Sequence, residues 1–399
     1  MAVTTEPGVE PTFRGPYDLT EDQELFKRTV HEFAAREIVP VAHELDEREE
    51  YPRQTVARMG ELGLLGLLVP ETFGGAGASA LDYVLAMEEV SWADASHAVV
   101  LSVTTSLVCE PIARFGTPAQ QQTYLPALAR GEYVGAYCLS EATSGSDAAN
   151  MHARARRQPD GSWVLNGTKS WISNGGEAGL YLVYAVSDPD APRAHGITAF
   201  LVPSDTPGLR AGGKEKKLGI RASSTCQMFF EDCRVPASAV LGQVDEGFRI
   251  AMATLDGGRI GIAAQALGIA QRAYDEAARY ATEREAFGQP IADFQGLQWR
   301  LADMAVRIEA SRLLAYRAAR MKDAGEPFSK QASMAKLHAS ETAMFVTHAA
   351  VQMLGGYGFV REYPVEKLFR DAKITEIYEG TSEIQRLVIA RHLLKEVRG

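Results

Sequence analysis

Apolar residues near the start of the chain recur at helical intervals. Leu25, Phe26, Val30 and Phe33 follow this spacing. The preceding Thr20 and Gln23 have the spacing of a capping box, in which two side chains satisfy free backbone N–H groups at a helix start. Similar patterns continue to about residue 130. We expect this region to be helical, with breaks at Pro40, Pro52, Pro70 and Pro111.

Between about residues 134 and 240 the pattern changes to short runs rich in β-branched and aromatic residues. The clearest runs are residues 164–165, 181–186, 197–202 and 228–230, and a Pro-Asp-Gly turn signal at 159–161 precedes the first of them. A compact domain of antiparallel strands fits this pattern.

After Phe248 the helical pattern returns, and the few prolines there leave intervals long enough for long helices. Ala332, Ala335 and Ala339 share one helical face, which lets neighbouring helices pack closely. The order of patterns predicts an α+β protein. Its expected parts are a loose tail (1–17), an N-terminal helical domain (18–133), a middle antiparallel β domain (134–243) and a C-terminal helical bundle (244–399).

Composition narrows the class of protein. The 399 residues are 46% apolar and carry a net charge of −10, which argues against binding to nucleic acid or to an anionic membrane. No run approaches the roughly 18 apolar residues of a membrane span, and no secretory signal is seen, so we expect a cytoplasmic protein, with the mitochondrial matrix also compatible. The four cysteines and eight histidines lack metal-site spacing, so we expect free buried cysteines and no metal.

The stretch 377–385 places a carboxylate between two bulky apolar residues and a glycine. Glu379 is followed at once by Gly380, and Ser382 and Gln385 have capping-box spacing, so a final helix is predicted to start here. A carboxylate beside bulky apolar groups loses hydration. This loss raises its pKa from about 4.3 towards neutrality, where a general base is most useful. The alternative is an ordinary solvated glutamate in a loop.

Two loops of the β region offer hydroxyls and backbone N–H groups to a polar ligand. The first, residues 137–147, leaves an apolar run and enters small hydroxyl residues. The second, residues 169–176, places Trp171 two residues before Ser173, so the indole could wall a planar cofactor while the hydroxyl bonds to its edge. The alternatives are a plain β-turn loop and a core tryptophan before a turn.

Three segments of the second helical region carry charged or glycine-rich patterns. Arg284 precedes a glycine-proline turn and suits a pyrophosphate, or forms a surface ion pair. Residues 352–358 are glycine-rich, but they lack the strand–glycine–helix context of a dinucleotide fingerprint, and the alternative is a helix-ending turn. Residues 256–259 are predicted to begin a long helix, where Arg259 orders an active-site wall or simply faces solvent.

Taken together and in this order, the motifs resemble the acyl-CoA dehydrogenase family, from about Leu19 to the C-terminus. Residues 218–221, 255–263 and 374–386 are similar to its short-chain, butyryl-CoA type. The resemblance implies helical, β and helical domains, FAD bound between the β domain and the C-terminal helices, and a homotetramer. It also implies FAD-dependent α,β-dehydrogenation of a short-chain acyl-CoA to the trans-2-enoyl-CoA in fatty-acid β-oxidation, with electrons passed to electron-transfer flavoprotein.

By the same resemblance, Glu379 matches the catalytic base. It would remove the α-proton while the β-hydrogen leaves as hydride to flavin N5, and its backbone N–H would help to hold the thioester oxygen. The residues expected to contact FAD, partly from a neighbouring subunit, are Tyr137, Leu139, Ser140, Gly145, Ser146, Trp171, Ile172, Ser173, Arg284, Phe287, Gln295, Gln352, Leu354, Gly355, Gly356, Thr381, Ser382 and Glu383. Those expected on the substrate side are Ser146, Asp256, Gly257, Gly258, Arg259, Tyr378 and Gly380.

Two positions depart from the family pattern. Family members often have a proline after the glutamate of the flavin loop, whereas Ala142 follows Glu141 here, so the backbone of that loop is expected to differ. Some members carry the base near residue 258, where this chain has Gly258, and this leaves Glu379 as the candidate.

Other functions stay open at this point. One is an acyl-CoA oxidase, which hands electrons to oxygen, and another is a dehydrogenase of a branched or modified acyl-CoA. A third, from a different class, is a catalytically idle helical binding module, which would have lost the base or the flavin residues. Acyl chain length, pathway and electron acceptor are not fixed by the residues.

Overall fold

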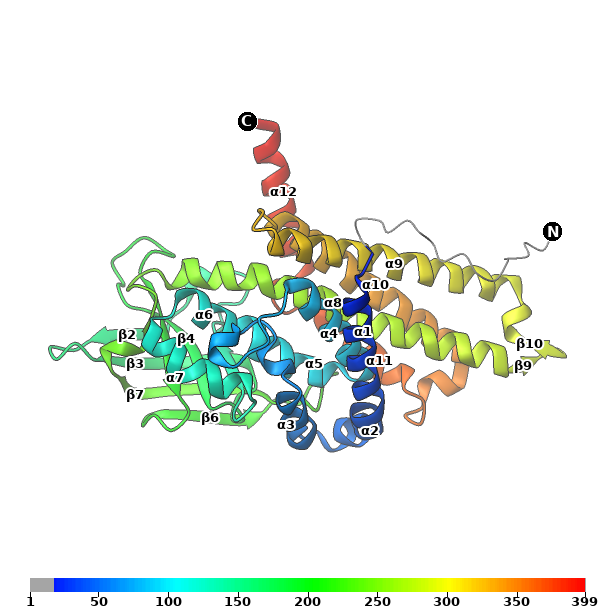
Figure 1. The fold of residues 1–399 in the computed structure, drawn as a ribbon, viewed down its shortest axis with the longest axis horizontal. Helices are drawn as coiled ribbons and strands as arrows, with labels where there is room; N and C mark the ends of the chain where they lie inside the picture. Colours follow the sequence, from blue (N-terminus) through cyan, green and yellow to red (C-terminus); the bar gives the residue numbers. More distant parts are fainter. Residues whose placement is uncertain (1–17, 399) are drawn as a thin grey trace.

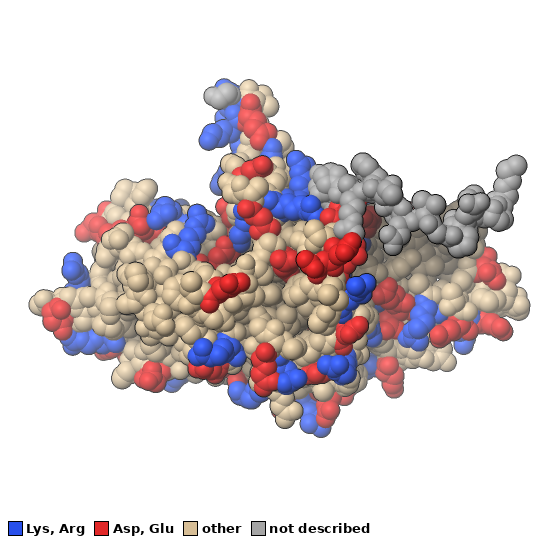
Figure 2. Space-filling view, viewed as in Figure 1, with Lys and Arg blue, Asp and Glu red and all other residues tan. Residues whose placement is uncertain are grey.

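The computed structural model describes residues 18–398, so the predicted tail at 1–17 lies outside the described residues. A β-sheet lies at one end of the molecule, and α8 (Gly247–Glu283) extends from it towards the other end (Figure 1). Helices α9 (Gln295–Asp323) and α10 (Ser329–Leu354) lie beside α8 away from the sheet, and shorter N-terminal helices lie in front of them. On the face seen in Figure 2, acidic and basic side chains are interspersed. This face therefore shows no large surface of one charge sign.

The N-terminal region is helical, as predicted. Its elements are α1 (Glu21–Phe33), η1 (Ala34–Ile38), α2 (Val39–Arg48), α3 (Arg53–Glu61), η2 (Leu64–Gly66), η3 (Glu71–Phe73), α4 (Ala80–Ala93), α5 (Ala95–Ser102), η4 (Val103–Cys109), α6 (Glu110–Phe115) and α7 (Pro118–Ala129). The capping box predicted at Thr20 and Gln23 is present with both of its hydrogen bonds. It fixes where the first helix begins.

Two of the four predicted helix breaks are wrong. Pro52 and Pro70 stand just before helical segments and do separate elements. Pro40 and Pro111, in contrast, lie in the first turns of α2 and α6, and each follows a π-helical segment, η1 and η4 respectively. A proline lacks the N–H of a regular turn and its ring displaces a carbonyl, and the wider π turn before it absorbs this mismatch, so the helix continues.

The β domain is one sheet with the strand order β6-β7-β3-β2-β4-β5-β8, and β1 lies beside β4. Its strands are β1 (Gly135–Cys138), β2 (Arg154–Arg157), β3 (Trp163–Ser173), β4 (Leu180–Val186), β5 (Ile197–Pro203), β6 (Leu209–Lys214), β7 (Thr225–Val235) and β8 (Val240–Leu241). The predicted runs fall within β3, β4, β5 and β7.

The expectation of antiparallel strands is correct for most pairs but wrong at β1. Strands β1 and β4 run parallel, from the pair Gly135–Leu180 to the pair Cys138–Val183. Strands β2 and β4 are also joined by one parallel pair. The connection permits this pairing: the chain passes through β2 and β3 before it returns beside β1, and parallel strands need a crossover of this kind of length.

The C-terminal region is dominated by three long helices. Its elements are α8 (Gly247–Glu283), β9 (Glu285–Ala286), β10 (Gln289–Pro290), η7 (Ile291–Asp293), α9 (Gln295–Asp323), α10 (Ser329–Leu354), η8 (Gly355–Phe359), α11 (Val365–Ala372), η9 (Lys373–Glu376) and α12 (Ser382–Arg398). Ala332, Ala335 and Ala339 are fully buried on α10, which packs closely on α8. Residues 256–259 do not begin a helix as predicted, because α8 already begins at Gly247.

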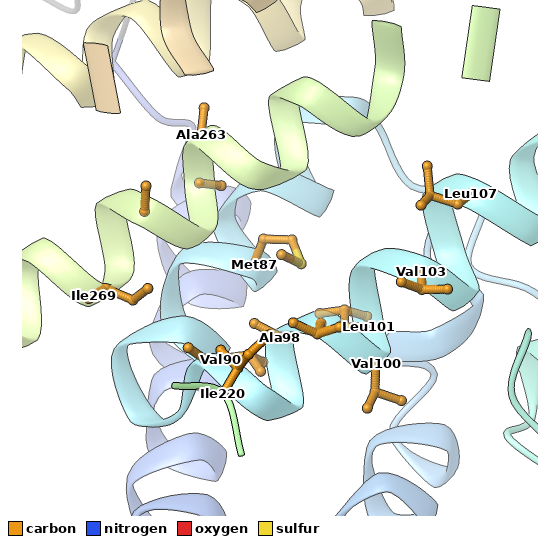
Figure 3. Packing of buried hydrophobic residues seen from close by; sticks show 14 of the residues in the cluster. Met87, Val90, Ala98, Val100, Leu101, Val103, Leu107, Ile220, Ala263 and Ile269 are labelled. Atoms are coloured by element: carbon orange, nitrogen blue, oxygen red, sulfur yellow. The ribbon is translucent and has the colours of Figure 1, made fainter. Parts of the chain in front are cut away.

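The core joins all three regions. Met87, Leu107, Ile220 and Ala263 lie within one buried cluster, and they come from α4, η4, a loop of the β domain and α8 (Figure 3). The continuous helical segment Ala95–Phe115 is long and apolar enough to cross a membrane by composition, but 78% of its most apolar window is buried inside the structure. Core helices of soluble proteins pass the same test.

Candidate active site

Glu379 lies on a tight turn between η9 and α12. Its φ of 50° and the φ of 91° at Gly380 are both left-handed, so the chain reverses direction sharply. Glu379 as a whole is half-buried, but its Oε2 atom is shielded from solvent and has no hydrogen-bond partner among residues 18–398. A buried carboxylate oxygen without a donor is costly, which marks it as available for chemistry.

The final helix starts one residue earlier than its predicted cap implies. Thr381 caps the helix, because its Oγ1 accepts from the Ile384 N–H at 3.3 Å and its carbonyl accepts from the Gln385 N–H at 2.9 Å. The capping box predicted between Ser382 and Gln385 is therefore wrong. The Gln385 side chain instead donates back to the carbonyls of Glu379 and Gly380, at 3.2 and 2.9 Å.

Helix α8 presents a glycine, Gly258, to the turn. A methyl group at Gly258 would overlap Oε2 of Glu379 and would lie 3.0 Å from the Leu107 side chain. One at Gly261 would overlap the hydroxyl of Tyr83 on α4. The Glu379 carboxylate therefore fits against bare backbone of α8, and no larger residue fits at Gly258 without moving it.

Burial and two cations set the protonation of Glu379. Desolvation raises the pKa of its carboxyl to about 7, although Lys336 and Arg259 act in the opposite direction. Arg259 is itself paired with Asp256 on the same helix and contacts the Ser333 hydroxyl at 3.4 Å. Near neutral pH the carboxyl and the carboxylate of Glu379 are thus both well populated, which suits a group that accepts and releases a proton.

Two tyrosines border the site. The Tyr378 hydroxyl is hydrogen-bonded to Gln265 of α8. Tyr137, on β1, packs its ring 5.2 Å from that of Tyr184, and its hydroxyl is 3.5 Å from the Ala251 carbonyl. Burial raises the pKa of both Tyr137 and Tyr378, and the Glu379 charge adds to the effect. The field of Glu379 therefore reaches the first strand of the β domain.

The loop after β1 is anchored by Glu141. Its carboxylate accepts from the buried Lys169 ammonium at 2.8 Å and from the N–H groups of His152 and Ala153 at 2.6 and 2.9 Å. Ala142 lies at the exposed tip of the following turn. Replacement of proline by alanine at the tip leaves the anchor in place. Of the predicted residues here, Leu139 is buried, Ser140 is half-buried, and Gly145 and Ser146 are exposed.

Trp171 is an exposed residue and not a core tryptophan. Its φ is 62° and 61% of its surface is accessible, because an irregularity in the pairing of β3 with β7 between Lys169 and Ile172 turns it outward. Ile172 is buried in the sheet and Ser173 is half-buried. The indole is therefore free to lie against a planar ligand.

Seven of the other predicted cofactor residues lie near the far end of α8. Arg284 ends this helix, 25 residues after Arg259, which is about 38 Å along the axis at about 1.5 Å per residue. Phe287 is 97% exposed on the β9–β10 hairpin, at the end of the molecule opposite the sheet (Figure 1). A cleft of about 490 Å³ there is lined by Arg284, Leu354, Gly355, Gly356 and Tyr357. Gln295 and Gln352 are exposed. One chain does not bring this group to Glu379.

Sequence reasoning missed Lys336, which is fully buried on α10. Its Nζ donates to the Gly380 carbonyl at 2.6 Å. The available signal was its position beside Ala332 and Ala335, because a lysine on the small-residue face of a helix is buried when that face packs. Within residues 18–398, no group of three or more His, Cys, Asp or Glu is placed to hold a metal, and the four cysteines are buried and free.

Comparison with known proteins shows to which family the chain belongs. The N-terminal, middle and C-terminal domains of acyl-CoA dehydrogenase match residues 20–132, 136–233 and 245–394. The mouse mitochondrial short-chain specific acyl-CoA dehydrogenase is 52% identical over 96% of this chain and 92% of its own length. The structure of butyryl-CoA dehydrogenase from Megasphaera elsdenii is 45% identical, with a TM-score of 0.93, and the alignment covers 94% of this chain and 99% of that one.

A second solved chain comes from a study of the electron-transferring flavoprotein of Acidaminococcus fermentans. It is 46% identical with a TM-score of 0.93, over 95% of this chain and 100% of that one. The chain described here belongs to the acyl-CoA dehydrogenase family. It is an FAD-dependent oxidoreductase that dehydrogenates an acyl-CoA, as the resemblance in the sequence predicted.

The described residues fit FAD on observations of their own. A methyl group at Gly145, Gly355 or Gly356 would meet nothing within 4 Å, so these backbones are open to close approach. The Ser382 hydroxyl is buried without a partner within residues 18–398. In the same range Arg284 forms no ion pair and its guanidinium lies over the Tyr357 ring, so it is available to a phosphate.

Proposed function

We propose that this enzyme converts a short-chain acyl-CoA to the trans-2-enoyl-CoA, with Glu379 as the base that takes the α-proton. The observation that carries the proposal is the buried, partnerless Oε2 of Glu379, on a carboxyl whose pKa is raised to about 7. The bound flavin supplies the two-electron acceptor, its N5 atom, for the β-hydrogen. The rest of the chemistry falls to residues of this chain.

Glu379 receives the proton at Oε2, which lies against the bare backbone of Gly258. The backbone N–H of Glu379, on the left-handed turn that Gly380 completes, would donate to the thioester oxygen, where developing negative charge needs a donor. Gly257, Gly258, Arg259 and Tyr378 border the substrate, and Asp256 holds Arg259 in place. The buried surroundings exclude water, which raises the pKa of the carboxyl and so makes the ionised Glu379 a stronger base for the α-proton.

FAD would be held by two groups of residues. The first comes from the β domain and the start of α12, namely Tyr137, Leu139, Ser140, Gly145, Ser146, Trp171, Ile172, Ser173, Thr381, Ser382 and Glu383. The second comes from the far cleft, namely Arg284, Phe287, Gln295, Gln352, Leu354, Gly355 and Gly356. Because about 38 Å of α8 separates the far cleft from Arg259 beside the base, the second group must act on the cofactor of a neighbouring subunit.

The expected substrate is a straight short acyl chain, and the similarity to short-chain and butyryl-CoA dehydrogenases supports this choice. Anaerobic titration of the holoenzyme with butyryl-CoA should bleach the flavin absorbance, with weaker bleaching by octanoyl-CoA and isovaleryl-CoA. If only the other acyl groups bleach the flavin, the proposed dehydrogenation stands but the short-chain substrate assignment is wrong. Rapid oxygen consumption during turnover would instead identify an oxidase.

Electron-transfer flavoprotein is the proposed electron acceptor, and the similarity to the Acidaminococcus chain supports this choice.

A homotetramer would bring the two groups of cofactor residues together. Trp299, Val306 and Leu313 recur every seven residues on α9 and are 63, 69 and 41% exposed. Such an apolar stripe on a long helix is typical of a surface that packs against a second helix. We therefore infer that copies of this chain associate through α9.

Charge on this stripe should disperse the assembly. We expect Val306→Glu to shift the mass in light scattering to smaller species and to lower FAD occupancy, because a buried unpaired carboxylate opposes association. Leu62→Glu is the matched control, since Leu62 is 50% exposed between α3 and η2, apart from the stripe. An unchanged mass and unchanged FAD content in Val306→Glu would contradict the assignment of this surface.

A further inference from the structure

Lys336 occupies an unusual place for a lysine. It is fully buried on α10, and within residues 18–398 it forms no ion pair. A buried ammonium without an ion-pair partner is costly, and burial lowers its pKa to about 8. Its hydrogen bond goes to the carbonyl of Gly380, the residue next to the proposed base, at 2.6 Å. A costly group in this position calls for a function.

Two side-chain donors form hydrogen bonds to the backbone carbonyls of the turn that carries Glu379. Lys336 and the Nε2 of Gln385 both bond to the Gly380 carbonyl, and Gln385 also reaches the Glu379 carbonyl at 3.2 Å. Both residues of the turn have left-handed backbone angles, which are unfavourable for a glutamate. The donors fix the direction of both carbonyls, so they stabilise an arrangement that the backbone alone would not hold.

The charged and titratable groups facing Glu379 come from four further elements. Lys336 comes from α10, Arg259 from α8, Tyr83 from α4 and Tyr137 from β1, and Tyr378 precedes Glu379 in the chain. Arg259 is ion-paired with Asp256, which offsets its charge. Glu376 and Glu383 also raise the pKa of Lys336, each less than Glu379 does. Lys336 is therefore the cation beside Glu379 without an ion-pair partner among residues 18–398.

We propose that Lys336 is a positioning residue for the reaction, which holds the Glu379 turn through the Gly380 carbonyl and supplies a positive charge beside the Glu379 carboxylate. The proposal rests on Glu379 as the base. An opposite charge favours the carboxylate, so its loss should raise the pKa of Glu379 above its value of about 7. The enzyme would then need a higher pH to carry an ionised base.

The test is the pH dependence of flavin bleaching by butyryl-CoA in holoenzyme with Lys336→Met. We expect the pKa of the acidic limb of the rate–pH profile to rise by roughly one unit. At pH 6 the rate of the variant, relative to its own maximum, should then be about tenfold lower than that of the parent enzyme. Lys336→Arg keeps the charge and the donor and should keep the parent profile. Thr342→Val is the matched control, because Thr342 is buried on the same helix and its hydroxyl has no partner within residues 18–398.

An infrared titration of the protonated Glu379 carboxyl, recognised by its loss in Glu379→Gln, gives the same shift without turnover. An unmoved carboxyl titration in Lys336→Met overturns the proposal, as does a uniform loss of rate at every pH. Full activity of Glu379→Gln would overturn the assignment of the base, while the infrared shift would still report on Lys336. Should Lys336→Met fail to fold, Lys336→Gln removes the charge, keeps an N–H donor and must show the same upward shift.

Discussion

Glu379→Gln should lower the rate of flavin reduction by butyryl-CoA by roughly 10³- to 10⁴-fold, the size of effect expected when a general base is lost. Glutamine has the shape of the glutamate and should fit against Gly258, but its amide does not accept a proton at neutral pH. FAD content and melting temperature should stay close to those of the parent, because Oε2 has no hydrogen-bond partner within residues 18–398 to lose. Stopped-flow absorbance of the flavin measures the effect.

Glu376→Gln is the matched control for this substitution. Glu376 lies three residues earlier and pairs with Lys373 at 2.6 Å, away from the buried carboxylate, so its loss should leave the rate within a fewfold of the parent. The pH profile gives a second check: the parent should lose activity as pH falls through about 7, where Glu379 becomes protonated. Fast flavin reduction that survives in Glu379→Gln would remove this residue from the role of base.

The turn that carries the proposed base could be predicted from sequence because its signal is local. Two bulky residues before Glu379 and a glycine after it predict a desolvated carboxylate on a turn, and the structure has this turn. The helical and β regions were predictable for a similar reason, since apolar periodicity reports directly on which face of an element is buried. The long helices followed from the rarity of prolines after residue 248.

Features that depend on distant partners could not be read from the sequence. The small residues around Lys336 indicate that its face of α10 packs, but they do not identify the partner of its ammonium, because the hydrogen bond to Gly380 joins residues 44 positions apart. The parallel pairing of β1 with β4 depends on the path of the intervening chain. The continuation of helices through Pro40 and Pro111 depends on π turns that no residue pattern announces.

The separation of the predicted cofactor residues into two distant groups also depends on the three-dimensional structure. Pattern and resemblance identify them as a set, but the length of α8 decides that Arg284 and Glu379 of one chain lie far apart. A catalytic unit of this enzyme is therefore larger than one chain if both groups bind the same FAD. The apolar stripe on α9 offers the surface through which that unit would assemble.

Gly258→Ala should slow flavin reduction by about 10²-fold, because a methyl group there would occupy the space of the Glu379 Oε2, and a displacement of about 1 Å in a reacting group has effects of this size. Stability should change little, since the preference for alanine over glycine in a helix, roughly 1 kcal/mol, is offset by the crowding against Glu379 and Leu107. A slower but equally or more stable enzyme would thus separate the position of the carboxylate from the integrity of α8. Thermal melting and stopped-flow absorbance, measured on the same holoenzyme, provide the two readouts.

Gly213→Ala is the matched control for this last substitution, because a methyl group at Gly213 on β6 meets nothing within 4 Å. Its rate should equal that of the parent. The acidic limb of the Gly258→Ala profile should also move, since a displaced carboxylate changes both its burial and its distance from Lys336. Parent-like rate and profile in Gly258→Ala would mean that the Glu379 carboxylate does not act from its place against α8. The base would then have to move before it reacts.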